Sequence, residues 1–340
     1  MRWYRDVPQS GAVTEEQSGR RLISNHPNYT SMALHYPLSD ESRERLNREF
    51  WMNYDTDHWF FKIKTYDLLL ENTEEFFEEL GDEELEEKSV EAFHQAIESE
   101  IVFTFYHITE SLYMLLGVCN SVVPWLEMKH IRVGEIADFI RETVVDEDWE
   151  DGALEEIFYP GLRIPEEHEG TKEESLTFIS EYLSRMSHWY LDNDIYNEYK
   201  HGLRLSTSGG SIKMAPEKEP GGETGPVAFA REGTTHVYLE EEEVHREDSE
   251  VYLKLNRVMS GFDYELFLQL CYINYLLLDQ IVRIRRDSPD DKREDEETRI
   301  EVNSFHDFEI DEIFDYDASK EWAFRLTYPA GEDFSGVTIG

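Results

Sequence analysis

The residues whose types and spacing could do chemistry lie at the end of one predicted helix, Thr171–Leu205. Its first part carries apolar side chains three and four residues apart, which is typical of one buried helix face: Leu176, Ile179, Leu183, Met186 and Tyr190. Continued at about 100° per residue, the same face then becomes polar: Asn193, Asn197, His201 and Arg204, with Lys200 at its margin. An imidazole can move protons near neutral pH, and cations beside it can hold a phosphate. The pattern therefore predicts His201 as a catalytic base, and predicts contacts to substrate or phosphate from the other four polar residues.

A second interpretation of the same residues is structural and stays open. Gly202 is suited to the position just after a helix end, where the backbone turns left-handed. Lys200 and His201 would then lie in the last turn, where cations are favoured by the helix dipole, and the asparagines would bond locally.

The segment DIYNEYKHGLR, closing the third long helix of a predicted bundle, resembles the HEPN superfamily of nucleotide-binding domains. That superfamily includes RNA-cleaving toxins and defence nucleases as well as non-catalytic binding modules. The resemblance implies a protein that binds or cleaves RNA or a nucleotide, and His201 is the residue carried over as base. Catalytic members have an arginine shortly before that histidine, where this chain has Asp194, Ile195 and Tyr196. Whether the chain is an enzyme is thus left open.

A bundle metal centre is a less favoured alternative. Such centres use Glu-x-x-His pairs on two helices, and Glu91/His94 and Glu198/His201 have this spacing. The spacing also occurs at Glu127/His130 and Glu242/His245, as chance allows in a glutamate-rich chain. In the second long helix, His107 and Glu110 lie one turn apart among apolar residues and predict a buried polar pair. No Walker pattern, nucleophile elbow or cysteine cluster is present, so no cofactor is predicted.

The charge is strongly negative, with 75 acidic and 32 basic side chains and a net charge of −43 in 340 residues. Such repulsion is screened at molar salt, and the composition resembles that of salt-adapted haloarchaeal proteins. Nucleic acid would be repelled in dilute buffer. Basic residues still cluster at Lys200–Arg204 and Arg283–Arg286, both at predicted helix ends, where they either complement the helix dipole or contact phosphate.

The fold predicted around these residues is mainly α, a bundle of four long helices with a small β-hairpin insert. An irregular N-terminal arm spans 1–38, and an acidic linker and tail span 287–340. Between them, the bundle domain spans 39–286, with a helical excursion at 118–170 and the insert at 203–240. The long helices are expected at about 57–80, 84–117, 171–205 and 248–286, from their apolar stripes.

Two hairpins make up the predicted insert, with turns at Thr207–Gly210 and Glu232–Thr235, and the tail holds a possible strand at Trp322–Tyr328. Cys119 and Cys271 are expected to be buried thiols. No run of about 18 to 20 residues is free of polar groups, so no membrane span is predicted and a cytoplasmic location is expected. The alternative to the RNA or nucleotide hypothesis is a non-enzymatic scaffold or assembly subunit that contacts a protein partner or a second copy.

Overall fold

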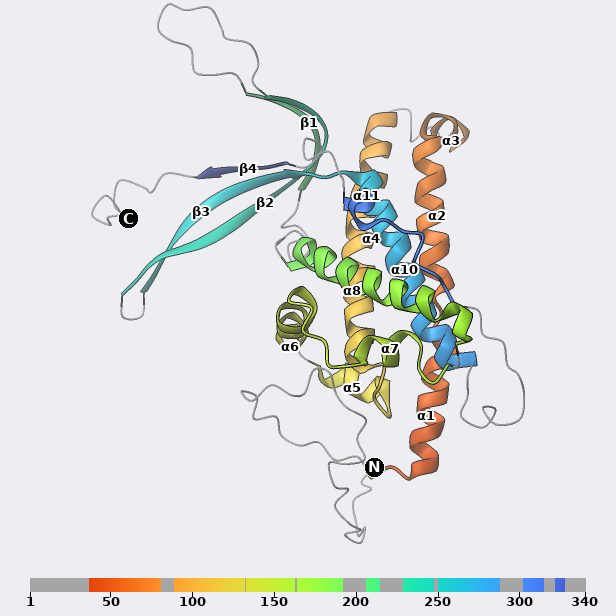
Figure 1. Cartoon of the computed structure of the whole chain (residues 1–340). Helices are drawn as coiled ribbons and strands as arrows, with labels where there is room; N and C mark the ends of the chain where they lie inside the picture. The colour runs from red at the N-terminus through yellow and green to blue at the C-terminus, as the bar shows by residue number, and fades with distance from the viewer. Residues whose placement is uncertain are drawn as a thin grey trace, which may run out of the picture. The chain divides into compact units, whose positions relative to one another are not determined.

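The computed structural model describes residues 37–80, 89–131, 133–162, 164–191, 206–214, 229–247, 250–287, 302–314 and 322–327. The fold is mainly helical with a small antiparallel sheet, as predicted (Figure 1). Asn193, Asn197, Lys200, His201 and Arg204 lie outside the described residues. The chain divides into two compact units. Unit 1 takes its described residues from Met1–Asp55, Tyr113–Arg163 and Gln280–Val302, and unit 2 from Thr56–Leu112, Ile164–Asp279 and Asn303–Gly340.

Unit 1 is built from short helices and from the ends of two long ones. Its short elements are α1 (Asp40–Asn53), α5 (Pro124–His130), α6 (Val133–Phe139), a π-helical turn (Ile140–Val145) and α7 (Ala153–Phe158). The last turns of α4 (Val90–Val118) and α10 (Tyr264–Asp287) also belong to it. Ser39 caps α1: its Oγ accepts a hydrogen bond from the Ser42 amide at 3.2 Å.

Unit 2 contains the rest of α4 and α10 together with α2 (Asp57–Glu71), α3 (Thr73–Leu80), α8 (Glu169–Leu191) and α11 (Ile310–Phe314). In this unit α8 crosses α4 and α10 (Figure 1). The single helix expected at about 57–80 is broken at Asn72. The Thr73 hydroxyl donates to the carbonyls of Leu69 and Leu70, at 2.6 and 3.2 Å, and so replaces part of the helical bonding at the break.

The core of unit 2 follows the predicted apolar stripes. In α4, Ile101, Phe105 and Ile108 are fully buried, which confirms that this helix is central. In α8, Ile179, Leu183 and Met186 are fully buried, as the spacing predicted. Both cysteines are free and buried, again as predicted.

A buried polar chain joins three helices of unit 2. The Tyr182 hydroxyl on α8 donates to Asn274 Oδ1 on α10 at 2.8 Å, and Asn274 Nδ2 donates to Thr109 Oγ1 on α4 at 2.9 Å. All three side chains have no exposed surface. Satisfied polar groups at this depth fix how the helices are aligned, because any shift would leave a buried donor or acceptor unpaired.

The sheet differs from the two predicted hairpins. Four antiparallel strands lie in chain order: β1 (Ser206–Met214), β2 (Phe229–Glu247), β3 (Glu250–Gly261) and β4 (Trp322–Thr327). The expected turns at Thr207–Gly210 and Glu232–Thr235 lie within β1 and β2, where those residues pair with one another in register. The fourth long helix begins at Tyr264 and not near 248, because the preceding segment is β3. The strand expected at the tail is confirmed as β4.

Candidate functional site

The residues predicted to form the polar end of the third long helix come after Leu191, the last described residue of α8. His201 and its four neighbours therefore remain a prediction. The last described turn before them is aromatic: the Tyr190 ring lies 6.4 Å from that of Tyr106, between ring centroids. Burial, with the nearby charge of Glu110, raises the pKa of Tyr190, so its phenol stays protonated.

The expectation of a buried pair at His107 and Glu110 is wrong for the histidine. His107 is exposed, and its ring lies edge-on to Trp59 with centroids 5.3 Å apart. Glu110 is half-buried near Tyr190. In the sequence, His107 and Glu110 are both surrounded by apolar residues, which suggested that both are buried. Their side chains leave α4 on parts of its surface that differ in exposure.

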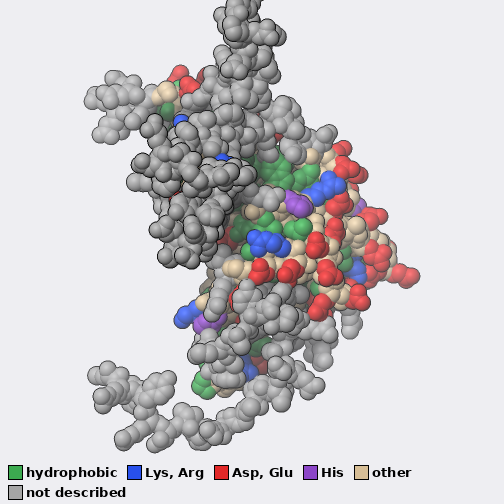
Figure 2. Space-filling view, turned by 90° about the vertical axis from the view of Figure 1, so that its left-hand side faces the viewer, with side chains coloured by type: hydrophobic (Ala, Val, Ile, Leu, Met, Phe, Trp, Pro, Cys, Tyr) green, Lys and Arg blue, Asp and Glu red, His purple; other side chains and the backbone are tan. Residues whose placement is uncertain are grey.

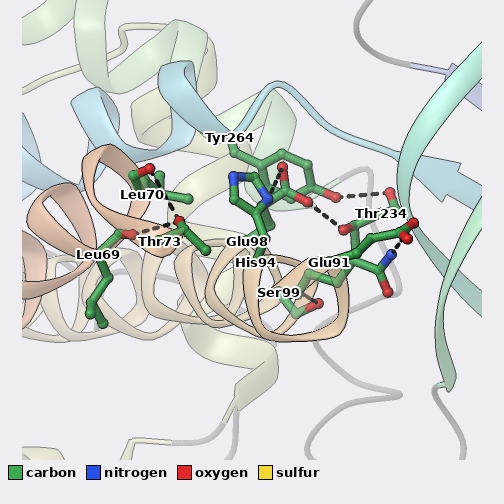
Figure 3. A network of polar contacts seen from close by, with 10 residues as sticks. Leu69, Leu70, Thr73, Glu91, His94, Glu98, Ser99, Thr234 and Tyr264 are labelled. Carbon is green, nitrogen blue, oxygen red and sulfur yellow. Dashed lines mark hydrogen bonds and ion pairs between the residues drawn. The ribbon is translucent and has the colours of Figure 1, made fainter. Parts of the chain in front are cut away.

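The residues proposed for a metal centre are engaged otherwise in α4 (Figure 3). Glu91 Oε1 accepts a hydrogen bond from Gln95 Nε2 at 3.2 Å. His94 Nδ1 lies 3.4 Å from Glu98 Oε1, one turn further on. Within the part of the chain that the structure describes, no three histidine, cysteine or carboxylate groups converge as metal ligands. The Glu198/His201 pair is outside that part.

A network of polar contacts is centred on Glu98, and we call His94, Glu98, Thr234 and Tyr264 the Glu98 cluster (Figure 3). Thr234 of β2 donates its hydroxyl proton to Glu98 Oε2. Tyr264, at the start of α10, donates to the Thr234 carbonyl at 2.8 Å. Three elements that are distant in sequence are thereby tied at one point. Burial, and secondly the Glu98 charge, raises the pKa of Tyr264, which keeps this donor protonated.

The chemistry available to the Glu98 cluster is limited by how its members are used. The Glu98 side chain is 15% exposed and the His94 side chain 41% exposed, so only the imidazole reaches solvent freely. With Nδ1 turned to Glu98, Nε2 of His94 is the acceptor, an arrangement that could bind a donor or accept a proton. Thr234 donates to the Glu98 carboxylate and accepts from Tyr264. These two hydrogen bonds hold β2 against α4 and α10.

His236, two residues along β2 from Thr234, is a buried histidine of another kind. It has no exposed surface, and its ring lies edge-on to Phe103 and Phe262, at centroid distances of 5.6 and 5.5 Å. Neither ring nitrogen has a hydrogen-bond partner among the described residues. Burial lowers the pKa of His236 to about 4, so the ring is neutral at physiological pH.

Of the predicted basic cluster Arg283–Arg286, Arg285 is used inside unit 1. Its five N–H groups donate to the carbonyls of Cys119, Ile157, Ile281 and Glu156 at 3.1, 2.8, 3.2 and 3.2 Å, and to Asn120 Oδ1 at 3.1 Å. Its charge also lies 5.3 Å from the centre of the Trp51 ring. A guanidinium with these partners has no donor left for a phosphate. Arg285 therefore has a structural role. Its hydrogen bonds join α10 to other segments of unit 1, in addition to any favourable interaction with the helix dipole.

An exposed apolar surface lies on the outer part of β2 and β3, beyond the residues that pair with β1 and β4. Leu239, Leu253 and Leu255 are 51%, 52% and 36% exposed. The register pairs Leu239 with Arg257 and Leu255 with Glu241, so all three leucines share one face, which we call the leucine face. The residues of the opposite face are buried: His236, Tyr238, Asn256 and Val258.

The Glu98 cluster and the leucine face could not be found from local sequence. Glu98 and Thr234 are 136 residues apart, and only the i,i+4 spacing of His94 and Glu98 was visible. For the leucine face, the alternation Val251, Leu253, Leu255 with polar residues between was a period-two signal. It was obscured by the helical stripe that follows.

Comparison with known proteins adds no family: no protein-family model, curated protein or solved structure matches the chain. Among the described helices, α4 is long and apolar enough to cross a membrane, judged by length and composition. Within the structure, 72% of that stretch is buried, as in the core helix of a folded domain.

Proposed function

We propose that this chain is a non-enzymatic assembly protein that binds another protein through the arm formed by the outer parts of β2 and β3. The observation that carries the proposal is the leucine face. Single exposed leucines are common on protein surfaces, but three on one side of a two-stranded ribbon form a patch that is suited to a partner. On the opposite side of the arm, Tyr238 is buried and Glu240 and Lys254 are half-buried, so the apolar side chains that the described part of the arm exposes lie on the leucine face.

The use of the polar groups also supports binding over catalysis. Three described residues that could do chemistry are occupied by structural contacts: Glu98 with Thr234, Asn274 with Tyr182 and Thr109, and Arg285 with main-chain carbonyls. A catalytic site needs groups that are held in place yet left open to a substrate. His94 has an open nitrogen but no second reactive group beside it other than Glu98.

The test is capture of a stoichiometric partner from native high-salt lysate with the full chain as bait. Leu239→Ser/Leu253→Ser should lose the partner, because it replaces the two most exposed leucines of the face. Leu68→Ser is the matched control, since Leu68 is a leucine of α2 with 59% exposure, away from the arm in sequence. A monomer that retains no stoichiometric partner, or a partner retained equally by both variants, would refute the proposal.

A second candidate function is the HEPN-like binding or cleavage of RNA or a nucleotide. It is favoured by the helix bundle and by the motif that begins just after Leu191, with His201 as base and Lys200 and Arg204 as phosphate contacts. His201→Ala should abolish RNA binding or cleavage in molar KCl with little change in thermal stability. His188→Ala, which replaces an exposed histidine of α8, is the control. An unchanged RNA phenotype would remove this candidate.

The surface charge makes high salt essential in that assay. Acidic side chains are spread over the described surface in Figure 2, with few lysines and arginines among them. With a net charge of −43, the chain would repel a polyanion in dilute buffer whatever site it has.

A further inference from the structure

Resting on the proposed function, we infer that the partner contributes an extended segment in which apolar residues alternate with lysine or arginine, and that this segment lies on the leucine face. The evidence is the charge of the arm itself. Between Tyr238 and Leu255 the chain has seven acidic and two basic residues. The acidic ones are Glu240, Glu241, Glu242, Glu243, Glu247, Asp248 and Glu250, and the basic ones are Arg246 and Lys254.

Acidic and apolar positions are interleaved on the leucine face. Glu241 is exposed and lies directly across the ribbon from Leu255, and the position of Glu243 pairs with that of Leu253. Arg257, also exposed, lies across from Leu239 at the inner end of the face, so the acidic positions are those beside the two leucines of β3. Cross-strand neighbours of this kind are about 5 Å apart. An apolar side chain that covers Leu255 would therefore be flanked by the Glu241 carboxylate, within reach of a lysine or arginine of the partner. Electrostatic complementarity of this kind selects partners and fixes their register.

The spacing of the leucines favours an extended partner. Leu253 and Leu255 are two residues apart on one strand, which places them roughly 7 Å apart along the ribbon. An extended chain repeats its side chains at the same interval, so successive apolar residues would meet successive leucines. The part of β2 that pairs with β3 alone, Tyr238–Glu247, would match a segment of about ten residues.

A second copy of this chain fits the face less well. Two arms placed face to face would bring Glu241 and Arg257 of each copy into one interface, while each copy carries a net charge of −43. Like charges at short range oppose association unless salt screens them, and every other part of the chain adds to the repulsion. A basic segment would be attracted to the acidic chain, whereas a second copy would be repelled by it.

The test uses two fluorescein-labelled peptides of about ten residues, one alternating leucine and lysine and the other alternating leucine and glutamate. Anisotropy is measured with the full chain in low and in molar KCl. We expect the lysine peptide to bind with one-to-one stoichiometry and at least about tenfold more tightly than the glutamate peptide in low salt, with the difference shrinking in molar KCl. Leu239→Ser/Leu253→Ser should weaken binding of the lysine peptide by about tenfold or more, and Leu68→Ser should not.

The outcomes separate this inference from the proposed function. Equal binding of both peptides, lost in the leucine variant, would overturn the basic partner and keep the arm as a protein-binding site. Binding of the lysine peptide that the leucine variant leaves unchanged would overturn the site, because attraction to the acidic surface would explain it. Sedimentation of the chain as a dimer that Leu239→Ser/Leu253→Ser dissociates would assign the face to a second copy. Circular dichroism of each variant confirms folding, and Leu255→Ser repeats the test at an independent position.

Discussion

His236 should make the stability of unit 2 depend on pH in a way that one substitution removes. Its imidazole is fully buried between Phe103 and Phe262, without a partner for either nitrogen among the described residues. Protonation inside this apolar site would bury an unpaired charge. The folded protein therefore resists protonation, whereas the unfolded chain does not.

The sign and size of the effect follow from the two pKa values. Burial lowers the pKa of His236 from 6.5 to about 4. Between these values the unfolded chain binds more protons than the folded one, so stability falls as pH falls from about 6.5 toward 4. Above about pH 7 the ring is neutral in both states and contributes no pH dependence. The full difference corresponds to about 3 kcal/mol, and about 2.5 kcal/mol of it is lost by about pH 4.5.

The variant His236→Leu removes the titrating group and keeps an apolar side chain of similar size. Chemical denaturation in molar KCl at about pH 7 and about pH 4.5 gives the loss of stability for the parent and for the variant. Many carboxylates also titrate in this range, and the comparison cancels them because they are common to both proteins. The variant should lose about 2 kcal/mol less than the parent on acidification. It should be no less stable at pH 7, since two unpaired buried nitrogens are removed.

The exposed His188 on α8, in the same unit, provides the matched control. His188→Leu replaces an exposed histidine instead of a buried one, and so tests whether the effect belongs to the buried ring. If the parent and His236→Leu lose the same free energy on acidification, the ring is not buried without a partner and the reasoning is refuted.

Substitutions also test three of the polar contacts, those of Asn274, Arg285 and Glu98. Asn274→Leu should destabilise unit 2 by about 2 to 4 kcal/mol in denaturant melts because it leaves the hydroxyls of Tyr182 and Thr109 without this amide, and adding Tyr182→Phe and Thr109→Val should recover most of the loss. Arg285→Lys should lower the melting temperature of unit 1, with a cost of about 2 to 4 kcal/mol, since an ammonium cannot reach carbonyls on several sides; an unchanged melt would contradict this. Glu98→Gln should cost under about 1 kcal/mol because an amide still accepts from threonine, whereas Glu98→Leu should cost about 2 kcal/mol and speed amide exchange in β2; equal exchange in the two variants would show that the contact does not hold the strand.

The long helices of unit 2 could be predicted from the sequence because their buried residues recur at helical intervals along the chain. The buried residues of α8 recur three and four positions apart, and the second half of α4 is apolar nearly all round because it is central. The break at Asn72 was not visible, since the apolar stripe of α2 continues into α3. The break depends on the Thr73 hydroxyl bonding back to main-chain carbonyls, which spacing does not encode.

The sheet was harder to predict because its strands contain turn-forming residues. Gly209 and Gly210 indicate a turn when read locally, yet they lie within β1, paired with Thr234 and Gly233 of β2. A glycine can sit in a strand when the neighbouring strand supplies the hydrogen bonds, and that neighbour is distant in sequence. For the same reason the candidate contacts of Glu98 were not foreseen. His201 and the polar residues around it remain a prediction, because they lie outside the described residues.

Strand register couples the part of β2 that pairs with β1 to the outer part of β2 that belongs to the arm. Successive side chains of β2 point to opposite faces, so one register places His236 and Tyr238 on the buried face and Leu239 on the outer one. A shift of one residue would expose the buried pair and bury the leucine. Thr234, held by Glu98 and Tyr264 directly before this segment, fixes β2 against the helices and opposes such a shift. The Glu98 cluster is therefore best understood as the anchor that keeps the leucine face turned outward, which joins the two most distinctive features of unit 2 in one function.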